Sequence, residues 1–189
     1  MSSAQPWTGG GEPVATPLCV DLDGTLIHGD TLVISLRQIL CEMPWRLGRL
    51  VCSLARGRAR FKQAVAECLV PEASALPYRA NVVEFLRVQH AQGRRLILAT
   101  AADERIARAV AAHLGIFDAI IACQGQVNLK GVQKLHAIRQ LLGDSPFEYM
   151  GDSRTDVPIF LAASGAYLVS PAKEVLDALA DSGRIRKVF

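Results

Sequence analysis

Short apolar segments alternate with longer amphipathic segments along most of this sequence. Short apolar runs that end in turn residues are typical of strands buried on both faces of a sheet. Such runs lie at 17–24, 94–102, 117–123, 147–153 and 166–170. Segments with apolar residues at helical spacing follow them, at 81–93, 103–115, 132–143, 156–164 and 172–183. The alternation predicts an α/β fold, in which helices cover both faces of a parallel sheet.

One stretch interrupts this alternation. From Thr31 to Leu76 the pattern is helical throughout, with no strand signal. Because the stretch follows the first strand, we expect it to stand over the carboxyl edge of the sheet, where open α/β sheets bind ligands. The predicted parts of the chain are a flexible tail at 1–16, a core at 17–30 and 77–189, and a small α-helical cap at 31–76.

The first predicted strand ends in a cluster of polar residues with the pattern D-x-D-G-T. Its members are Asp21, Asp23, Gly24 and Thr25. Strand side chains alternate between faces, so the two aspartates leave the sheet on one side. Like charges this close are costly without a cation, and Mg²⁺ prefers such hard oxygen ligands. The alternative interpretation is a plain strand-to-turn junction, in which Asp and Gly serve only as turn formers.

A second acidic cluster follows the fourth predicted strand. Asp152 comes at the strand end, and Asp156 opens the next helix four residues later. Taken alone, they are equally well interpreted as a turn residue and a helix N-cap. Together with the first cluster they favour a shared ion site, because the acidic ends of two strands in one parallel sheet can converge.

Phosphate-binding candidates come from two further places. Thr100 ends the second predicted strand and precedes a helix, whose free backbone N–H groups can hold a phosphate. Lys130 and Lys134 lie at the start of the helix that leads into the fourth strand. One of them could steady a carboxylate nucleophile and neutralise phosphate charge. The alternative for either lysine is a solvated helix start.

Taken in order, D-L-D-G-T at 21–25, Thr100, a lysine at 130 or 134, and G-D-S-R-T-D at 151–156 resemble the four motifs of the haloacid dehalogenase-like (HAD) hydrolase superfamily. The resemblance covers residues 17–170 and implies a Rossmann-like core. It implies that Asp21 is the nucleophile that becomes an aspartyl-phosphate. Asp23 would then be the general acid and base, and its presence points to phosphate chemistry, because the dehalogenases lack this acid.

The same resemblance implies the remaining site residues and the cofactor. Thr100 and Ala101 would bind the phosphoryl oxygens, and Asp21, the backbone carbonyl of Asp23 and Asp152 would hold Mg²⁺. Asp156 would support the metal indirectly. Lys134 is preferred to Lys130, because the lysine-led helix of phosphoserine phosphatase-like members has similar spacing. The predicted function is a Mg²⁺-dependent phosphatase that acts on a small phosphorylated metabolite.

A narrower resemblance points to a membrane partner. The segments PLCVDLDGTL, GRRLILATAAD and YMGDSRTD are similar to the soluble N-terminal HAD domain fused to UbiA-type membrane prenyltransferases. This resemblance implies an alternative function: a weakly active or non-catalytic regulatory or binding domain associated with a membrane prenyltransferase.

Composition narrows the functional classes. Of the 189 residues, 50% are hydrophobic and 21% charged, which excludes a disordered chain. No apolar run is long enough to cross a bilayer, and the N-terminus lacks the pattern of a secretory signal. Five scattered cysteines without a C-x-x-C pair suit a reducing compartment, so we expect a cytoplasmic protein. A net charge of +3 gives no reason to expect nucleic-acid binding.

The charge is unevenly distributed. Six cations and no acids occur between positions 43 and 66, namely Arg46, Arg49, Arg56, Arg58, Arg60 and Lys62. Since the total charge is +3, the rest of the chain is net acidic. The basic segment is interpreted in three ways: a solvated helix face, a surface that attracts an anionic substrate, or a docking site for an anionic membrane or a membrane prenyltransferase. The last interpretation would place the protein at the inner face of the membrane.

Overall fold

The computed structural model describes residues 15–54, 57–124 and 129–189. In these residues six parallel strands form one sheet in the order β3-β2-β1-β4-β5-β6. The strands are β1 (Leu18–Val20), β2 (Leu96–Asp103), β3 (Ala119–Cys123), β4 (Glu148–Gly151), β5 (Gly165–Leu168) and β6 (Ile185–Val188). This is the doubly wound Rossmann-like order, so the predicted fold class is confirmed. The predicted tail lies almost wholly outside the described residues.

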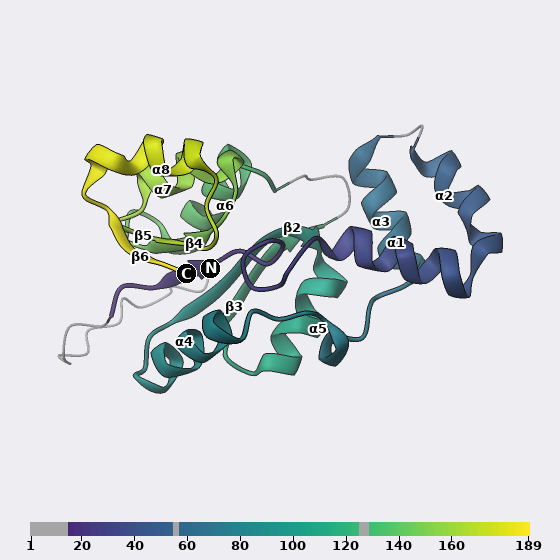
Figure 1. Cartoon of the computed structure of the whole chain (residues 1–189), viewed down its shortest axis with the longest axis horizontal. Helices are drawn as coiled ribbons and strands as arrows, with labels where there is room; N and C mark the ends of the chain where they lie inside the picture. The colour runs from purple at the N-terminus through teal and green to yellow at the C-terminus, as the bar shows by residue number, and fades with distance from the viewer. Residues whose placement is uncertain (1–14, 55–56, 125–128) are drawn as a thin grey trace, which may run out of the picture.

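Helices cover both faces of the sheet (Figure 1). The lower layer in the view is α4 (Ala80–Ala91) and α5 (Glu104–Leu114), and the upper layer is α6 (Val132–Leu142), α7 (Val157–Ala162) and α8 (Lys173–Leu179). Along β1 the side chains alternate between the layers: Leu18 and Val20 pack in the same core cluster as α4 and α5, whereas Cys19 packs in the cluster of the other three helices. Because both of its faces are buried, β1 is apolar over its whole length.

Strand β6 was not predicted from the sequence. It is an exposed edge strand, and its charged residues Arg186 and Lys187 interrupt the apolar pattern. Its order comes from backbone pairing with β5, where Ala166 lies opposite Ile185 and Leu168 opposite Val188. An edge strand with little buried surface leaves almost no hydrophobic signal in a sequence. The preceding helix also ends earlier than expected, at Leu179.

The insertion between β1 and α4 forms three helices, α1 (Thr31–Glu42), α2 (Leu47–Leu54) and α3 (Arg58–Cys68). They share a small hydrophobic cluster around Ile39, Leu50 and Val65, separate from the two clusters on the sheet. Figure 1 shows them side by side, projecting beyond the edge of the sheet at which β2 ends. Short 3-10 turns complete the chain at Pro44–Arg46, Ala73–Ala75, Arg154–Asp156 and Ala180–Ser182.

Candidate active site

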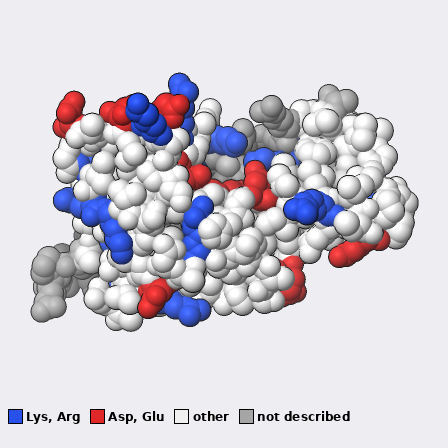
Figure 2. Space-filling model, in the orientation of Figure 1, with Lys and Arg blue, Asp and Glu red and all other residues white. Residues whose placement is uncertain are grey.

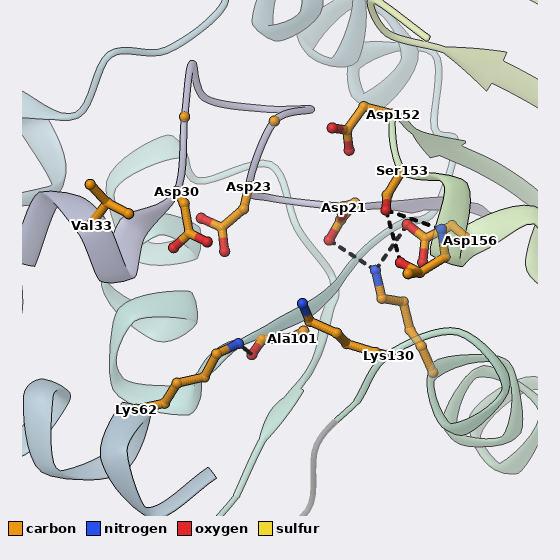
Figure 3. A pocket seen from close by; sticks show the side chains of 14 residues that line it. Asp21, Asp23, Asp30, Val33, Lys62, Ala101, Lys130, Asp152, Ser153 and Asp156 are labelled. Atoms are coloured by element: carbon orange, nitrogen blue, oxygen red, sulfur yellow. Dashed lines mark hydrogen bonds and ion pairs between the residues drawn. The ribbon is translucent and has the colours of Figure 1, made fainter. Parts of the chain in front are cut away.

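A cavity of about 530 Å³ opens at the carboxyl edge of the sheet, between the core and the inserted helices. Figure 2 shows this hollow with acidic side chains inside it and basic side chains around it. Its lining includes most of the residues predicted from the sequence, namely Asp21, Asp23, Ala101, Lys130, Lys134, Asp152 and Asp156. Figure 3 shows the cavity in close view, with all of these except Lys134 labelled. The fold therefore brings together residues that are up to 135 positions apart, as between Asp21 and Asp156.

The base of this cavity is an ion pair between Asp21 and Lys134. Asp21 directly follows β1, and its backbone N–H donates to the carbonyl of Met150 on β4 at 3.0 Å. Its Oδ1 lies 3.0 Å from Nζ of Lys134, and the two side chains are only 9% and 3% exposed. Burial acts to lower the pKa of Lys134, but the carboxylates of Asp21 and Asp156 outweigh it, so that the pKa is raised. The lysine therefore stays charged beside Asp21.

Of the two lysines considered, Lys134 occupies the buried position. Its Nζ also lies 3.4 Å from Oδ2 of Asp156 and donates to the hydroxyl of Tyr149 at 2.9 Å. Lys130 is exposed and lines the same cavity (Figure 3). Both lysines can approach an anionic ligand, but only Lys134 pairs with Asp21 in the structure.

The two acidic motifs are joined by Thr25 and Gly24. The Thr25 hydroxyl donates to Oδ1 of Asp152 at 3.1 Å. Gly24 has a φ of +78°, and a Cβ at this position would lie 2.2 Å from Oδ2 of Asp152. The close approach therefore requires glycine here. Sequence reasoning noted both residues as part of a motif but did not identify their contact with Asp152.

Three carboxyl groups of the site have raised pKa values. Burial raises the pKa of Asp23 to about 7, and the charges of Asp30 and Asp21 add to this effect. The Thr31 N–H, which donates to Asp23 Oδ1 at 2.7 Å, acts to lower the same pKa. Burial raises the pKa of Asp156 to about 6, against the effect of Lys134. Burial and the charge of Asp21 also raise the pKa of Asp152. Burial is thus the main cause of all three shifts, in a cavity whose lining carboxyl groups outnumber its lysines.

The carboxylates that line the cavity are suited to a divalent cation that keeps part of its water shell. Within the described residues, no three His, Cys, Asp or Glu side chains surround a common metal position. Mg²⁺, however, is commonly bound by one or two carboxylates and completes its octahedron with waters and substrate phosphate. The Asp21 and Asp152 carboxylates both line the cavity, and the metal ligands that they offer are oxygen atoms. The residues therefore fit Mg²⁺ by their chemistry.

We expect a measurement of stability against pH to detect the raised pKa of Asp23. An aspartate whose pKa is raised by folding binds more protons in the folded state than in the unfolded state. Its contribution to the free energy of unfolding therefore decreases as the pH rises from the unfolded pKa of 3.8 to the folded pKa of about 7. Without metal, wild-type protein should lose roughly 1–3 kcal/mol relative to Asp23→Asn between pH 4 and 7. Urea unfolding in EDTA measures this difference, and Mg²⁺ should offset it. Parallel pH profiles for the two proteins would contradict the expectation.

The phosphate-binding pair predicted at the end of β2 is only partly at the cavity. Ala101 lines it, whereas Thr100 is fully buried and its hydroxyl accepts from the Ala102 N–H at 3.0 Å. Lys62 of α3 is a cavity residue that sequence reasoning did not place here. Its Nζ donates to the carbonyl of Ala101 at 3.1 Å (Figure 3). Nothing local in the sequence separates Lys62 from the other cations of its segment.

The rest of the basic segment is described only in part. The exposed Arg46 donates to the carbonyl of Cys68 at 3.2 Å, and Arg60 is exposed. Arg56 lies outside the described residues, as do the side chains of Arg49 and Arg58. Among the described residues, no helix combines the length and the hydrophobicity that crossing a membrane requires.

Comparison with known sequences identifies the family. The profile of the haloacid dehalogenase-like hydrolases matches residues 18–161, which include both acidic motifs. The chain belongs to this family. The family resemblance predicted from the motifs is thereby confirmed, and the chain is a member of a hydrolase family. The narrower resemblance to domains fused to prenyltransferases stays a prediction.

Individual relatives of this HAD-family chain include one sequence and two solved structures. An uncharacterised protein, y4nM of Sinorhizobium fredii, is 38% identical over 167 residues, which is 88% of this chain and 32% of y4nM, so the chain spans about a third of that relative. A Bordetella pertussis protein of unknown function has a TM-score of 0.67 at 17% identity, covering 92% of this chain and 97% of that one. A substrate-bound phosphoserine phosphatase has a TM-score of 0.60 at 12% identity, covering 94% of each chain. These structures share the fold.

Proposed function

We propose that this chain is a Mg²⁺-dependent phosphatase that hydrolyses a phosphate monoester of a small metabolite through an aspartyl-phosphate on Asp21. The observation that carries the proposal is the 3.0 Å pair between Asp21 and the buried Lys134, in a cavity that Asp23 and Asp152 also line. The likeness to a phosphoserine phosphatase over 94% of the chain supports the reaction class. The cavity is large enough for a small phosphorylated molecule.

In the first half-reaction, a carboxylate oxygen of Asp21 attacks the phosphorus atom and bonds to it, while the bond between phosphorus and the ester oxygen of the substrate breaks. Lys134 holds this carboxylate and offsets its repulsion with the phosphate oxygens. Asp21, Asp152 and the backbone carbonyl of Asp23 would hold Mg²⁺, with Asp156 acting through water. When bound, the metal supplies further charge neutralisation and orientation of the phosphate.

Asp23 would transfer the protons of both half-reactions. A pKa of about 7 keeps a large share of this carboxyl protonated at neutral pH, as a general acid requires. It gives its proton to the leaving oxygen and, now ionised, takes a proton from the water that hydrolyses the aspartyl-phosphate. The Thr31 N–H holds one of its oxygens in place at 2.7 Å.

The helices within 31–76 would act as a cap in this scheme. Val33 and Lys62 of the insertion line the cavity together with the core carboxylates. A cap at this place would contact the leaving group and exclude bulk water while the phosphoryl group is transferred. We propose that the substrate is selected here, because the phosphate itself is held by the core.

A second candidate is a binding domain with little turnover. It is favoured by large apolar side chains exposed on the insertion, among them Trp45 at 74%, Val51 at 67% and Leu54 at 52%. Together with the exposed Arg46 and Arg60 of the same insertion, these side chains would suit an anionic membrane or a membrane prenyltransferase. This function does not require turnover, so an activity assay separates the two candidates.

The test is hydrolysis of p-nitrophenyl phosphate and a panel of small phosphate monoesters by the purified chain. We expect hydrolysis in Mg²⁺ that falls at least about tenfold in EDTA and returns when Mg²⁺ is restored. Matched samples in Ca²⁺ have the same ionic strength. They test whether the effect is specific to Mg²⁺, because the larger Ca²⁺ ion prefers a more flexible set of ligands. A wild-type chain that hydrolyses no member of the panel in Mg²⁺ would overturn the proposal and favour the binding domain.

A further inference from the structure

Tyr149 lies behind the cavity rather than in its lining. It is on β4, two residues before Gly151, and its side chain is fully buried. Its ring packs edge-on against Phe160 of α7, with the ring centroids 5.1 Å apart. Phenylalanine at this position would make the same ring contacts. The hydroxyl of Tyr149 therefore needs its own explanation, since a buried polar group is costly unless it is hydrogen-bonded.

That hydroxyl lies between the two charged groups behind Asp21. It accepts from Lys134 Nζ at 2.9 Å and donates to Asp156 Oδ2 at 2.9 Å. Lys134 also reaches Asp21 Oδ1 at 3.0 Å and Asp156 Oδ2 at 3.4 Å. A lysine ammonium has three N–H donors, and here three acceptor oxygens lie within 3.4 Å of it. The ammonium is thus fixed in orientation as well as in place.

The need for a third anchor follows from the lysine side chain. Lysine carries a compact charge on a flexible stem of four carbons, so one ion pair leaves its position loosely defined. During the proposed reaction, the Asp21 carboxylate becomes part of an acyl phosphate, which is a mixed anhydride, and so loses the carboxylate charge that attracts Lys134. The contacts with Tyr149 and Asp156 do not involve the reacting atoms and can persist through that change.

We propose that Tyr149 is a positioning residue. Its hydroxyl holds the Lys134 ammonium against the nucleophile and holds the Asp156 carboxylate beside that ammonium. The inference rests on the proposed phosphatase function. It predicts that the hydroxyl affects the chemical step more than substrate binding, because the charge of Lys134 remains when the hydroxyl is removed. A displaced ammonium would still attract the substrate but would stabilise the transition state less well.

The experiment compares Tyr149→Phe with Tyr167→Phe. Both changes remove one tyrosine hydroxyl and keep the ring, but the Tyr167 hydroxyl pairs with Arg94, which precedes β2, rather than with the site. We expect Tyr149→Phe to lower kcat about tenfold with a change in KM of less than about threefold, while Tyr167→Phe stays within about twofold of wild type. Thermal unfolding of both variants shows whether each is folded at the assay temperature.

A double-mutant cycle gives a second measurement that a purely structural role would not move. In the Lys134→Met background, removing the Tyr149 hydroxyl should change kcat by less than about twofold, because its partner is already absent. Equal effects in both backgrounds would overturn the proposal, as would a wild-type kcat in Tyr149→Phe. An inactive wild-type chain would instead refute the proposed function, so the two failures are distinguishable. If Tyr149→Phe is unfolded at the assay temperature, the same comparison is made at a lower temperature, where the same outcomes decide.

Discussion

Replacing Asp21 with asparagine is expected to lower kcat for p-nitrophenyl phosphate by about 1000-fold or more. The amide has nearly the same shape as the carboxylate and can still accept from Lys134, so the fold should be kept. It is a far weaker nucleophile, however, and cannot form the acyl-phosphate. The measurement is steady-state hydrolysis in Mg²⁺, with circular dichroism to compare the folded states.

A trapping experiment provides the control for this variant. Asp23→Asn lacks the base for the second half-reaction, but p-nitrophenolate leaves without needing an acid. This variant should therefore accumulate a phosphorylated chain, detected as a gain of one phosphoryl group in intact mass. The double variant Asp21→Asn/Asp23→Asn should show no gain. A tenth or more of wild-type activity in Asp21→Asn would contradict the assignment of the nucleophile.

Replacing Lys134 with methionine is expected to reduce both activity and stability. We expect kcat/KM to fall about 100-fold, because the nucleophile and the phosphate lose their buried cation. We also expect about 3 kcal/mol less free energy of unfolding, because Asp21 and Asp156 would remain buried without their ion pair. Hydrolysis kinetics and urea unfolding in EDTA measure the two effects. Part of the lost stability should return in Mg²⁺.

Lys130→Met is the matched control, since Lys130 lines the same cavity but is exposed. Its free energy of unfolding should stay within about 0.5 kcal/mol of wild type, and its kcat/KM within about fivefold. This comparison also decides which lysine serves the motif. A larger loss of activity in Lys130→Met than in Lys134→Met would contradict the assignment to Lys134.

The sequence contained enough information to predict that the two acidic motifs lie together at one cavity. The strands beside Asp21 and Asp152 are buried on both faces, so their apolar runs were plain, and parallel strands bring their carboxyl ends to one edge. The choice between the two lysines was harder, since it depends on how α6 begins. Gly131 precedes α6 with a φ of +53°, and a Cβ there would lie 2.9 Å from the Thr155 carbonyl. The start of α6 therefore lies against the turn that carries Asp156, with Lys134 inside the helix and Lys130 before it.

Lys62 and Tyr149 show what sequence patterns could not supply. Lys62 lies in a segment with five other cations, and only the packing of α3 against β2 directs it toward Ala101. Tyr149 fits an apolar strand as well as phenylalanine would, so its hydroxyl carried no signal by itself. Its partners are Lys134 of α6, 15 residues before it, and Asp156 of the turn at Arg154–Asp156, seven residues after it. Both roles depend on contacts between elements.

The exposed strand β6 has a consequence for self-association. An open edge presents unpaired backbone groups, and a second copy of the chain could pair with them to extend the sheet. Here the edge is four residues long, and Arg186 and Lys187 occupy its middle. Two such edges brought together would place like charges side by side, which opposes pairing. We therefore expect the charges that interrupt the apolar pattern of this strand also to oppose aggregation along its sheet.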